Sequence, residues 1–126
     1  MRRLLPRPTD AELAILRVLW DRGPSSVRQV HEALAAGRDT GYTTTLKLMQ
    51  IMADKGLVTR DESSRTHIYA ARQSQGQTQR QLVSDLMDRA FGGSAAELVM
   101  QALSAHPASE DELKEIRRLI EEHRRK

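Results

Sequence analysis

Apolar residues recur at helical spacing in three successive segments of the first half of the chain. The first segment follows Thr9 and Glu12, which have the spacing of a capping box. Its apolar side consists of Leu13, Leu16, Leu19 and Trp20. Gly23-Pro24 then predicts the end of this helix, because neither residue supports helix propagation.

A second helix is predicted from a repeat of the same capping pattern at Ser26 and Gln29. Its inner face consists of Val27, Val30 and Leu34, and it is expected to end near Gly37. Residues 38–42 follow as a short connector that could contribute one strand-like pairing.

The third segment, residues 41–58, reads GYTTTLKLMQIMADKGLV and predicts a helix that ends at Gly56. Thr45, Met49 and Met52 recur at spacings of four and three, which assigns them to the inner face. Three threonines at the start need an explanation, because β-branched residues are mediocre helix formers.

The hydrophobic period changes after this helix. Residues 57–61 and 66–71 read as two strands joined by the polar turn at 62–65. Three helices followed by a hairpin predict a winged helix-turn-helix over residues 1–72, and therefore a mainly α fold with a small β-hairpin.

Residues 73–126 predict a second, helical domain. A Gln-rich stretch leads into three short helices, separated by Gly92-Gly93 and Pro107, and the last opens with a capping box at Ser109 and Glu112. Such short helices cannot cover one another's apolar stripes. The expected cover is the same segment of a second chain in a two-fold dimer. The expected dimerisation residues are Leu82, Leu86, Phe91, Leu98, Val99, Leu103, Leu113, Ile116 and Ile120.

The start of the third helix is the candidate for reading DNA. With Thr45 inward, Thr43, Thr44 and Lys47 point outward, and Tyr42 lies beside them. A threonine hydroxyl can bond phosphate or a base acceptor, and its methyl group can pack on the thymine methyl. The alternative is that Thr43 only caps the helix and Thr44 only meets water.

Arg60, Arg65 and His67 lie in or beside the predicted wing. Cations at a wing tip can follow the sugar-phosphate backbone and position the domain without reading sequence. The alternative is a solvated turn whose charges are incidental.

Charge and composition reduce the number of functions that the chain could have. The net charge is +3, with +4 in residues 1–72 and −1 in residues 73–126, so the basic excess lies in the predicted DNA-binding half. The absence of cysteine excludes thiolate chemistry, and the four histidines have no ligand-like spacing. No cofactor, metal site or set of catalytic residues is expected. The protein is therefore not expected to be an enzyme. Without an apolar run of about 18 residues, a cytoplasmic protein is expected.

The motifs together resemble the BlaI/MecI (penicillinase repressor) family of bacterial transcriptional regulators. The resemblance is carried by YTTTLKLMQIMADKGLV with the wing ending IYAA, and it extends from RPTDAELAILRVLW through FGGSAAELVMQAL to ELKEIRRLIEE. It implies a homodimer that represses promoters from an inverted-repeat operator, in a β-lactam or cell-envelope stress response. By position it assigns base reading to Thr43, Thr44 and Lys47, and the wing contact to Arg65.

Two departures from the family pattern limit what the resemblance implies. The Asn-Phe bond that a regulatory protease cuts in β-lactam-responsive members falls at Gln101-Ala102 here, so that cleavage is not expected at this bond. The cysteine-based copper sensing of a related branch is excluded. A rival hypothesis is a protein-interaction adaptor, which requires an exposed apolar patch around Leu48 and Ile51.

Overall fold

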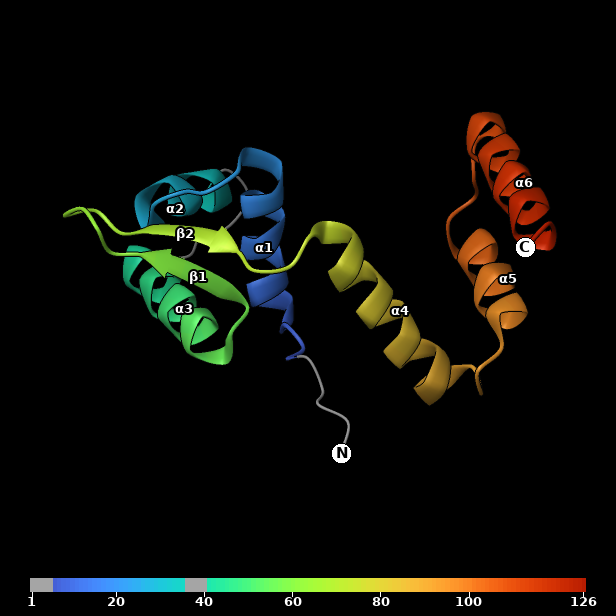
Figure 1. Cartoon of the computed structure of the whole chain (residues 1–126), viewed down its shortest axis with the longest axis horizontal. Coiled ribbons are helices and arrows are strands. Elements are labelled where there is room, and N and C mark those ends of the chain that lie inside the picture. The colour runs from blue at the N-terminus through green and yellow to red at the C-terminus, as the bar shows by residue number, and fades with distance from the viewer. Residues whose placement is uncertain (1–5, 36–40) are drawn as a thin grey trace. The chain divides into compact units, whose positions relative to one another are not determined.

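The computed structural model describes residues 6–35 and 41–126, which divide into two compact units, one that ends at Leu82 and one that begins at Val83. The elements follow the chain in the order shown in Figure 1. They are α1 (Asp10–Arg22), α2 (Val27–Ala35), α3 (Tyr42–Lys55), β1 (Val58–Asp61), β2 (Ile68–Ala71), α4 (Gln75–Ala90), α5 (Ala95–Ala105) and α6 (Glu110–Arg124). The mainly α fold with one hairpin is confirmed. The predicted connector at 38–42 and the predicted helix end near Gly37 fall largely outside the described residues.

The helix boundaries follow the predicted capping signals. The Thr9 hydroxyl accepts a hydrogen bond from the Glu12 backbone N–H at 3.2 Å, and the Thr9 N–H donates to the Glu12 carboxylate at 2.9 Å. Ser26 with Gln29 forms the same reciprocal pair. These side chains satisfy backbone groups that the first turn of a helix otherwise leaves unpaired.

Gly56 ends α3 as predicted. Its φ of 84° is in the left-handed region, where a side chain would be strained, and its N–H donates to the carbonyls of Met52 and Ala53. The chain therefore turns directly from α3 into the hairpin.

The two strands are antiparallel, with Val58 opposite Ala71 and Arg60 opposite Tyr69. A further pairing lies on the other edge of β2, where Ser25 and Tyr69 exchange two backbone hydrogen bonds of 2.8 and 2.9 Å. This bridge attaches the loop before α2 to the outer edge of β2, so the hairpin is tied to the helices along that edge.

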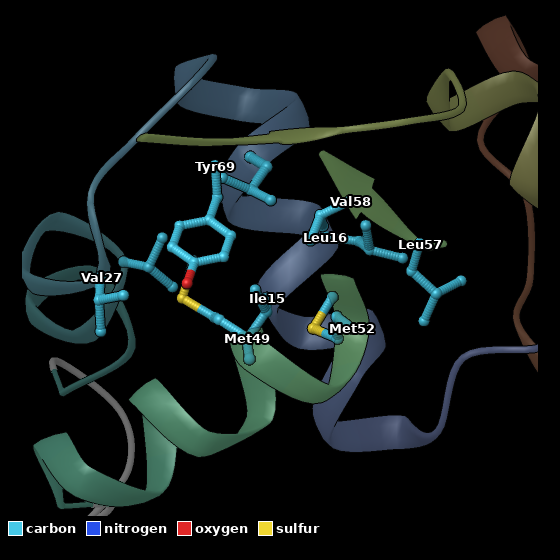
Figure 2. Close-up of a cluster of buried hydrophobic side chains, with 10 residues drawn as sticks. Ile15, Leu16, Val27, Met49, Met52, Leu57, Val58 and Tyr69 are labelled. Carbon is cyan, nitrogen blue, oxygen red and sulfur yellow. The ribbon is translucent and has the colours of Figure 1, made fainter. Parts of the chain in front are cut away.

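The core of the first unit lies between the three helices and the hairpin. Figure 2 shows the Tyr69 ring directed from β2 toward Met49 on α3, with Ile15 of α1 and Val27 of α2 nearby. The buried cluster consists of Ile15, Leu16, Leu19, Val27, Val30, Met49, Met52, Leu57, Val58 and Tyr69. The packing of α3 against this cluster fixes which of its sides remains exposed.

The beginning of α4 belongs to the first unit, where two hydrogen bonds and one buried side chain hold it and the residues just before it. Trp20 donates its indole N–H to the Gln73 carbonyl at 2.9 Å, Thr78 is buried, and the Gln81 amide donates to the Pro6 carbonyl at 3.3 Å. Ser74 and Gln77 cap the start of this helix. Trp20 is thus a packing residue, in agreement with its predicted place on the apolar side of the first helix, and it also binds the segment before α4.

An ion pair between a buried carboxylate and a partly exposed lysine fixes the far end of α3. Glu12 is 2% exposed, and its carboxylate accepts from Lys55 Nζ at 2.7 Å in addition to the Thr9 N–H. Burial tends to raise the pKa of Glu12, but the hydrogen bonds from Lys55 and Thr9 outweigh it, so the pKa is lowered overall. The pair joins the first turn of α1 to the last turn of α3.

The variant Lys55→Met is expected to lower the free energy of unfolding by about 1–2 kcal/mol, since it leaves the buried Glu12 carboxylate without its cation. This is below the loss of about 3–5 kcal/mol typical of fully buried pairs, because 34% of the Lys55 side chain is exposed. Urea denaturation at neutral pH, followed by Trp20 fluorescence, measures the difference.

The same pair predicts a pH dependence. Because the folded-state pKa of Glu12 is depressed, its contribution to stability is present above the ordinary glutamate pKa of about 4.3 and is lost as pH falls through the folded value.

The matched control for Lys55→Met is Lys47→Met, as Lys47 is exposed and has no ion pair within the described part of the chain. Equal destabilisation by both variants at neutral pH would contradict a specific role for the pair.

Candidate nucleic-acid interface

The threonines at the start of α3 divide into two groups. Thr45 is fully buried, and its hydroxyl donates to the Gly41 carbonyl at 3.5 Å and lies 3.4 Å from His31 Nδ1. Thr43 and Thr44 are exposed. One threonine therefore fills the core between α2 and α3, while the other two face solvent.

Thr43 does not cap this helix. The N-cap is Gly41, which has no side-chain cap, and Thr43 is the second residue of α3. Within residues 41–126 and 6–35, neither outward threonine hydroxyl has a hydrogen-bond partner. The first turn also carries no acidic residue, so its amide groups favour an anion. Capping is therefore not the role of Thr43, whereas the exposure of Thr44 fits both base reading and simple solvation.

The exposed side of α3 continues beyond the threonines. Lys47, Gln50 and Ile51 are exposed, as the helical wheel predicts, whereas Met49 and Met52 are fully buried. The outward side thus combines hydroxyl, amide, ammonium and one apolar group. Such a side chain set can meet base edges in a major groove.

The basic wing residues differ in whether another side chain already pairs with them. Arg60 pairs with Glu62 at 2.8 Å, and a hydrogen bond to the Tyr69 side chain and the charge of Glu62 raise its pKa. Arg65 and His67 are exposed, and neither makes an ion pair within the described residues. Among the predicted wing cations, Arg65 is therefore more available to a ligand than Arg60.

A cleft of about 380 Å³ lies between the start of α2, one side of α3 and the wing. The predicted residues Tyr42, Arg65 and His67 line it together with Gln50 and Arg28. The structure thus brings helix and wing residues to one concave surface. Thr43, Thr44 and Lys47 lie on the adjacent exposed side of α3, and Arg60 is not part of the lining.

Arg28 is a residue that sequence reasoning missed. Its guanidinium carbon lies 5.6 Å from the centre of the Tyr42 ring, and that ring meets His31 edge-on at 5.8 Å. The only local signal was an arginine in the first turn of the second predicted helix, two residues after its N-cap. Its approach to Tyr42 depends on the packing of α2 against α3, which the hydrophobic pattern alone does not specify.

The second unit has a different character. Throughout residues 83–126, all of which the structure describes, no side chain is buried. Six large apolar side chains are 41–63% exposed: Val83, Leu86, Val99, Met100, Leu119 and Ile120. Of the predicted dimerisation residues, Phe91, Leu98, Leu103, Leu113 and Ile116 are half-buried, and Leu82 is half-buried at the end of the first unit.

Two further findings concern other classes of site. No group of three metal-ligating side chains occurs among the residues that the structure describes. No helix in the same residues is long and apolar enough to cross a membrane.

The helices, the hairpin and the exposed side of α3 define a winged helix-turn-helix protein. The family model of the penicillinase repressor matches residues 8–122. The chain belongs to the penicillinase repressor family, and the resemblance noted in the sequence is confirmed.

Three relatives place the chain within this family. The transcriptional regulator BlaI of Mycobacterium tuberculosis, from strains CDC 1551 / Oshkosh and H37Rv, is 48% identical over 67 residues, covering 52% of this chain and 49% of the relative. The chain thus spans about half the length of these relatives. The penicillinase repressor of Bacillus licheniformis is 20% identical over 120 residues, covering 95% of this chain and 94% of the relative.

Proposed function

We propose that this protein is a DNA-binding transcriptional repressor that acts as a homodimer on an inverted-repeat operator. One observation carries the proposal: α3 buries Thr45, Met49 and Met52 and leaves Thr43 and Thr44 exposed, without capping duty, at its N-terminus. In helix-turn-helix proteins, this end of the recognition helix meets the base edges. Family membership and the names of the relatives support the same conclusion.

In this proposal the two ends of the interface have different tasks. Thr43, Thr44 and Lys47 read bases, while Arg65 and His67 on the wing, with Arg60 and Tyr42 beside them, position the domain on the backbone. Base contacts carry sequence preference, whereas phosphate contacts supply affinity that depends on salt.

A second copy of the chain is the proposed partner of residues 73–126. A unit without a buried side chain cannot hold its helices together by its own core, so its exposed apolar stripes need another surface. Two-fold symmetry would place two recognition helices in major grooves about 34 Å apart if the half-sites are one turn apart. The bacterial cytoplasm is the location that operator binding requires.

We further propose a β-lactam or cell-envelope stress response as the setting of repression. A regulatory protease remains a proposed partner, although the family's Asn-Phe bond aligns with Gln101-Ala102, an exposed pair on α5. The proposed function needs no catalytic step, cofactor or metal from this chain.

The adaptor hypothesis is the weaker alternative. It requires a continuous apolar patch around Leu48 and Ile51 on α3. Leu48 packs against the core, while Ile51 is 40% exposed. A lone exposed apolar residue among polar neighbours is ordinary on a protein surface.

The test is selection from a randomised duplex pool with the purified full chain at near-physiological salt. Sequencing of the retained DNA is expected to give a two-fold symmetric motif with fixed half-site spacing. Retention of no motif above background would contradict the proposed function and favour the adaptor.

Two variants separate base reading from backbone contact. Thr44→Ala is expected to reduce discrimination against mismatched half-sites, by up to about 1–3 kcal/mol at the base pair it reads. Arg65→Ala is expected to weaken binding to all duplexes and to lower the slope of log affinity against log salt by about 0.9 for each lost contact. Affinity titrations on operator and random duplex at several salt concentrations measure both. Equal losses on both duplexes for both variants would contradict this division.

A further inference from the structure

The cleft beside α3 contains a cationic side chain, Arg28, that is not among the residues of the predicted DNA interface. Arg28 enters it from α2, while Arg65 and His67 enter it from the wing. Its lining also includes Tyr42, Leu46 and Gln50, which follow one another at intervals of four along α3. The cleft therefore runs beside the helix that the proposed function places in the major groove.

Arg28 is held in position by its neighbours. Its guanidinium lies 5.6 Å from the Tyr42 ring centre, within the range of a cation–π contact. The ring contacts His31, whose Nδ1 lies 3.4 Å from the hydroxyl of the fully buried Thr45. This series of contacts links an exposed arginine to the core, which reduces the conformational entropy lost when it binds a ligand.

The chemistry of the cleft selects an anion with a flat or extended body. Arg28 and Arg65 can each offer several N–H donors, and arginine matches phosphate oxygens in a bidentate manner. The first turn of α2 contains no acidic residue to compete for them. Val27, Leu46 and Tyr69 add apolar surface to the lining, which suits the sugar of a nucleotide better than a free ion.

We infer that Arg28, positioned by Tyr42, is a further DNA contact, and that with Arg65 it holds a phosphodiester of the strand running beside the recognition helix. This inference rests on the proposed function and adds a second backbone contact opposite the wing. Besides its place in the proposed backbone contact, Tyr42 is then a positioning residue for Arg28, on which it acts through the cation–π contact.

The experiment compares the wild-type full chain with Arg28→Ala on the operator obtained by selection and on a random duplex. Arg28→Ala is expected to lower affinity for both duplexes by the same factor, and to reduce the salt slope by about 0.9 for each copy in contact. Arg17→Ala is the matched control, because Arg17 is exposed on the same unit and does not line the cleft.

The positioning role of Tyr42 is measured by a double-mutant cycle. Tyr42→Phe keeps the ring and is expected to retain the Arg28-dependent salt slope. Tyr42→Leu removes the ring, and its effect combined with Arg28→Ala is expected to be less than additive. Strict additivity would overturn the positioning role.

The phosphate itself is located by operators in which one phosphodiester is replaced by a neutral methylphosphonate. One position is expected to weaken the wild type more than it weakens Arg28→Ala, in which only Arg65 still contacts that phosphate. If Arg28→Ala keeps the wild-type salt slope, or matches Arg17→Ala at every position, the inference is overturned while the proposed function stands. If the wild type itself binds no DNA, the proposed function fails first.

Discussion

Ile120→Glu is expected to convert the proposed dimer into monomers and to lower affinity for the proposed inverted-repeat operator by at least about a hundredfold. Two half-site contacts joined in one body gain affinity from the high effective concentration of the second contact, and monomers lose that gain. A charge placed in an apolar interface must also be desolvated on association. Ile120 is 53% exposed in the single chain, so the variant can keep its helix while the interface fails.

Sedimentation equilibrium and fluorescence anisotropy with operator and with a single half-site measure this prediction. Affinity for the single half-site is expected to stay unchanged, because the first unit is untouched. Ser104→Glu is the matched control, since it adds the same charge at an exposed position on α5 opposite the apolar stripe. A dimeric Ile120→Glu protein, or an equal loss on the half-site, would contradict the proposed interface.

Much of the first unit could be predicted because its signals are local. Each capping box depends on residues three apart, and the structure forms the boxes at Thr9, Ser26 and Ser109. The helical period placed Thr45 inside and Thr44 outside from spacing alone. The same pattern left out Ile15, which is fully buried, because Leu13 and Trp20 formed an equally acceptable stripe.

Pairings between distant residues left no such signal. The bridge between Ser25 and Tyr69 joins segments 44 residues apart, and the sequence around Ser25 reads only as a loop before a helix. The Glu12–Lys55 pair is likewise long-range, and the sequence around Lys55 indicates only a favourable charge at a helix C-terminus. Both contacts depend on the fold rather than on neighbouring residues.

The candidate site likewise combines features that local sequence predicts with features that only long-range packing creates. The exposure of Thr43, Thr44 and Lys47 follows from the period of one helix. The shared cleft of Arg28 and Arg65 requires the packing of α2, α3 and the wing, so it is visible only in three dimensions. Base reading and backbone contact were assigned from residue chemistry and from the family resemblance, and they remain predictions.

Tyr69→Ala is expected to lower the free energy of unfolding of the first unit by about 3–5 kcal/mol, the usual cost of removing an aromatic ring from a core. Tyr69 is 1% exposed and lies in the buried cluster with Ile15 and Met49. Small domains have a total stability of about 5–15 kcal/mol, so much of it would be lost. Trp20, the single tryptophan, reports unfolding of this unit by fluorescence.

The loss of DNA binding that accompanies Tyr69→Ala has a distinct signature. Because binding favours the folded state by mass action, excess operator is expected to raise its melting temperature and restore folding. Thr44→Ala should instead stay folded and bind with altered preference at any operator concentration. Tyr69→Phe is the control: it keeps the ring, removes only the hydroxyl, and should cost about 1 kcal/mol. If the Phe variant lost as much stability as the Ala variant, the hydroxyl rather than ring packing would hold the hairpin against α3.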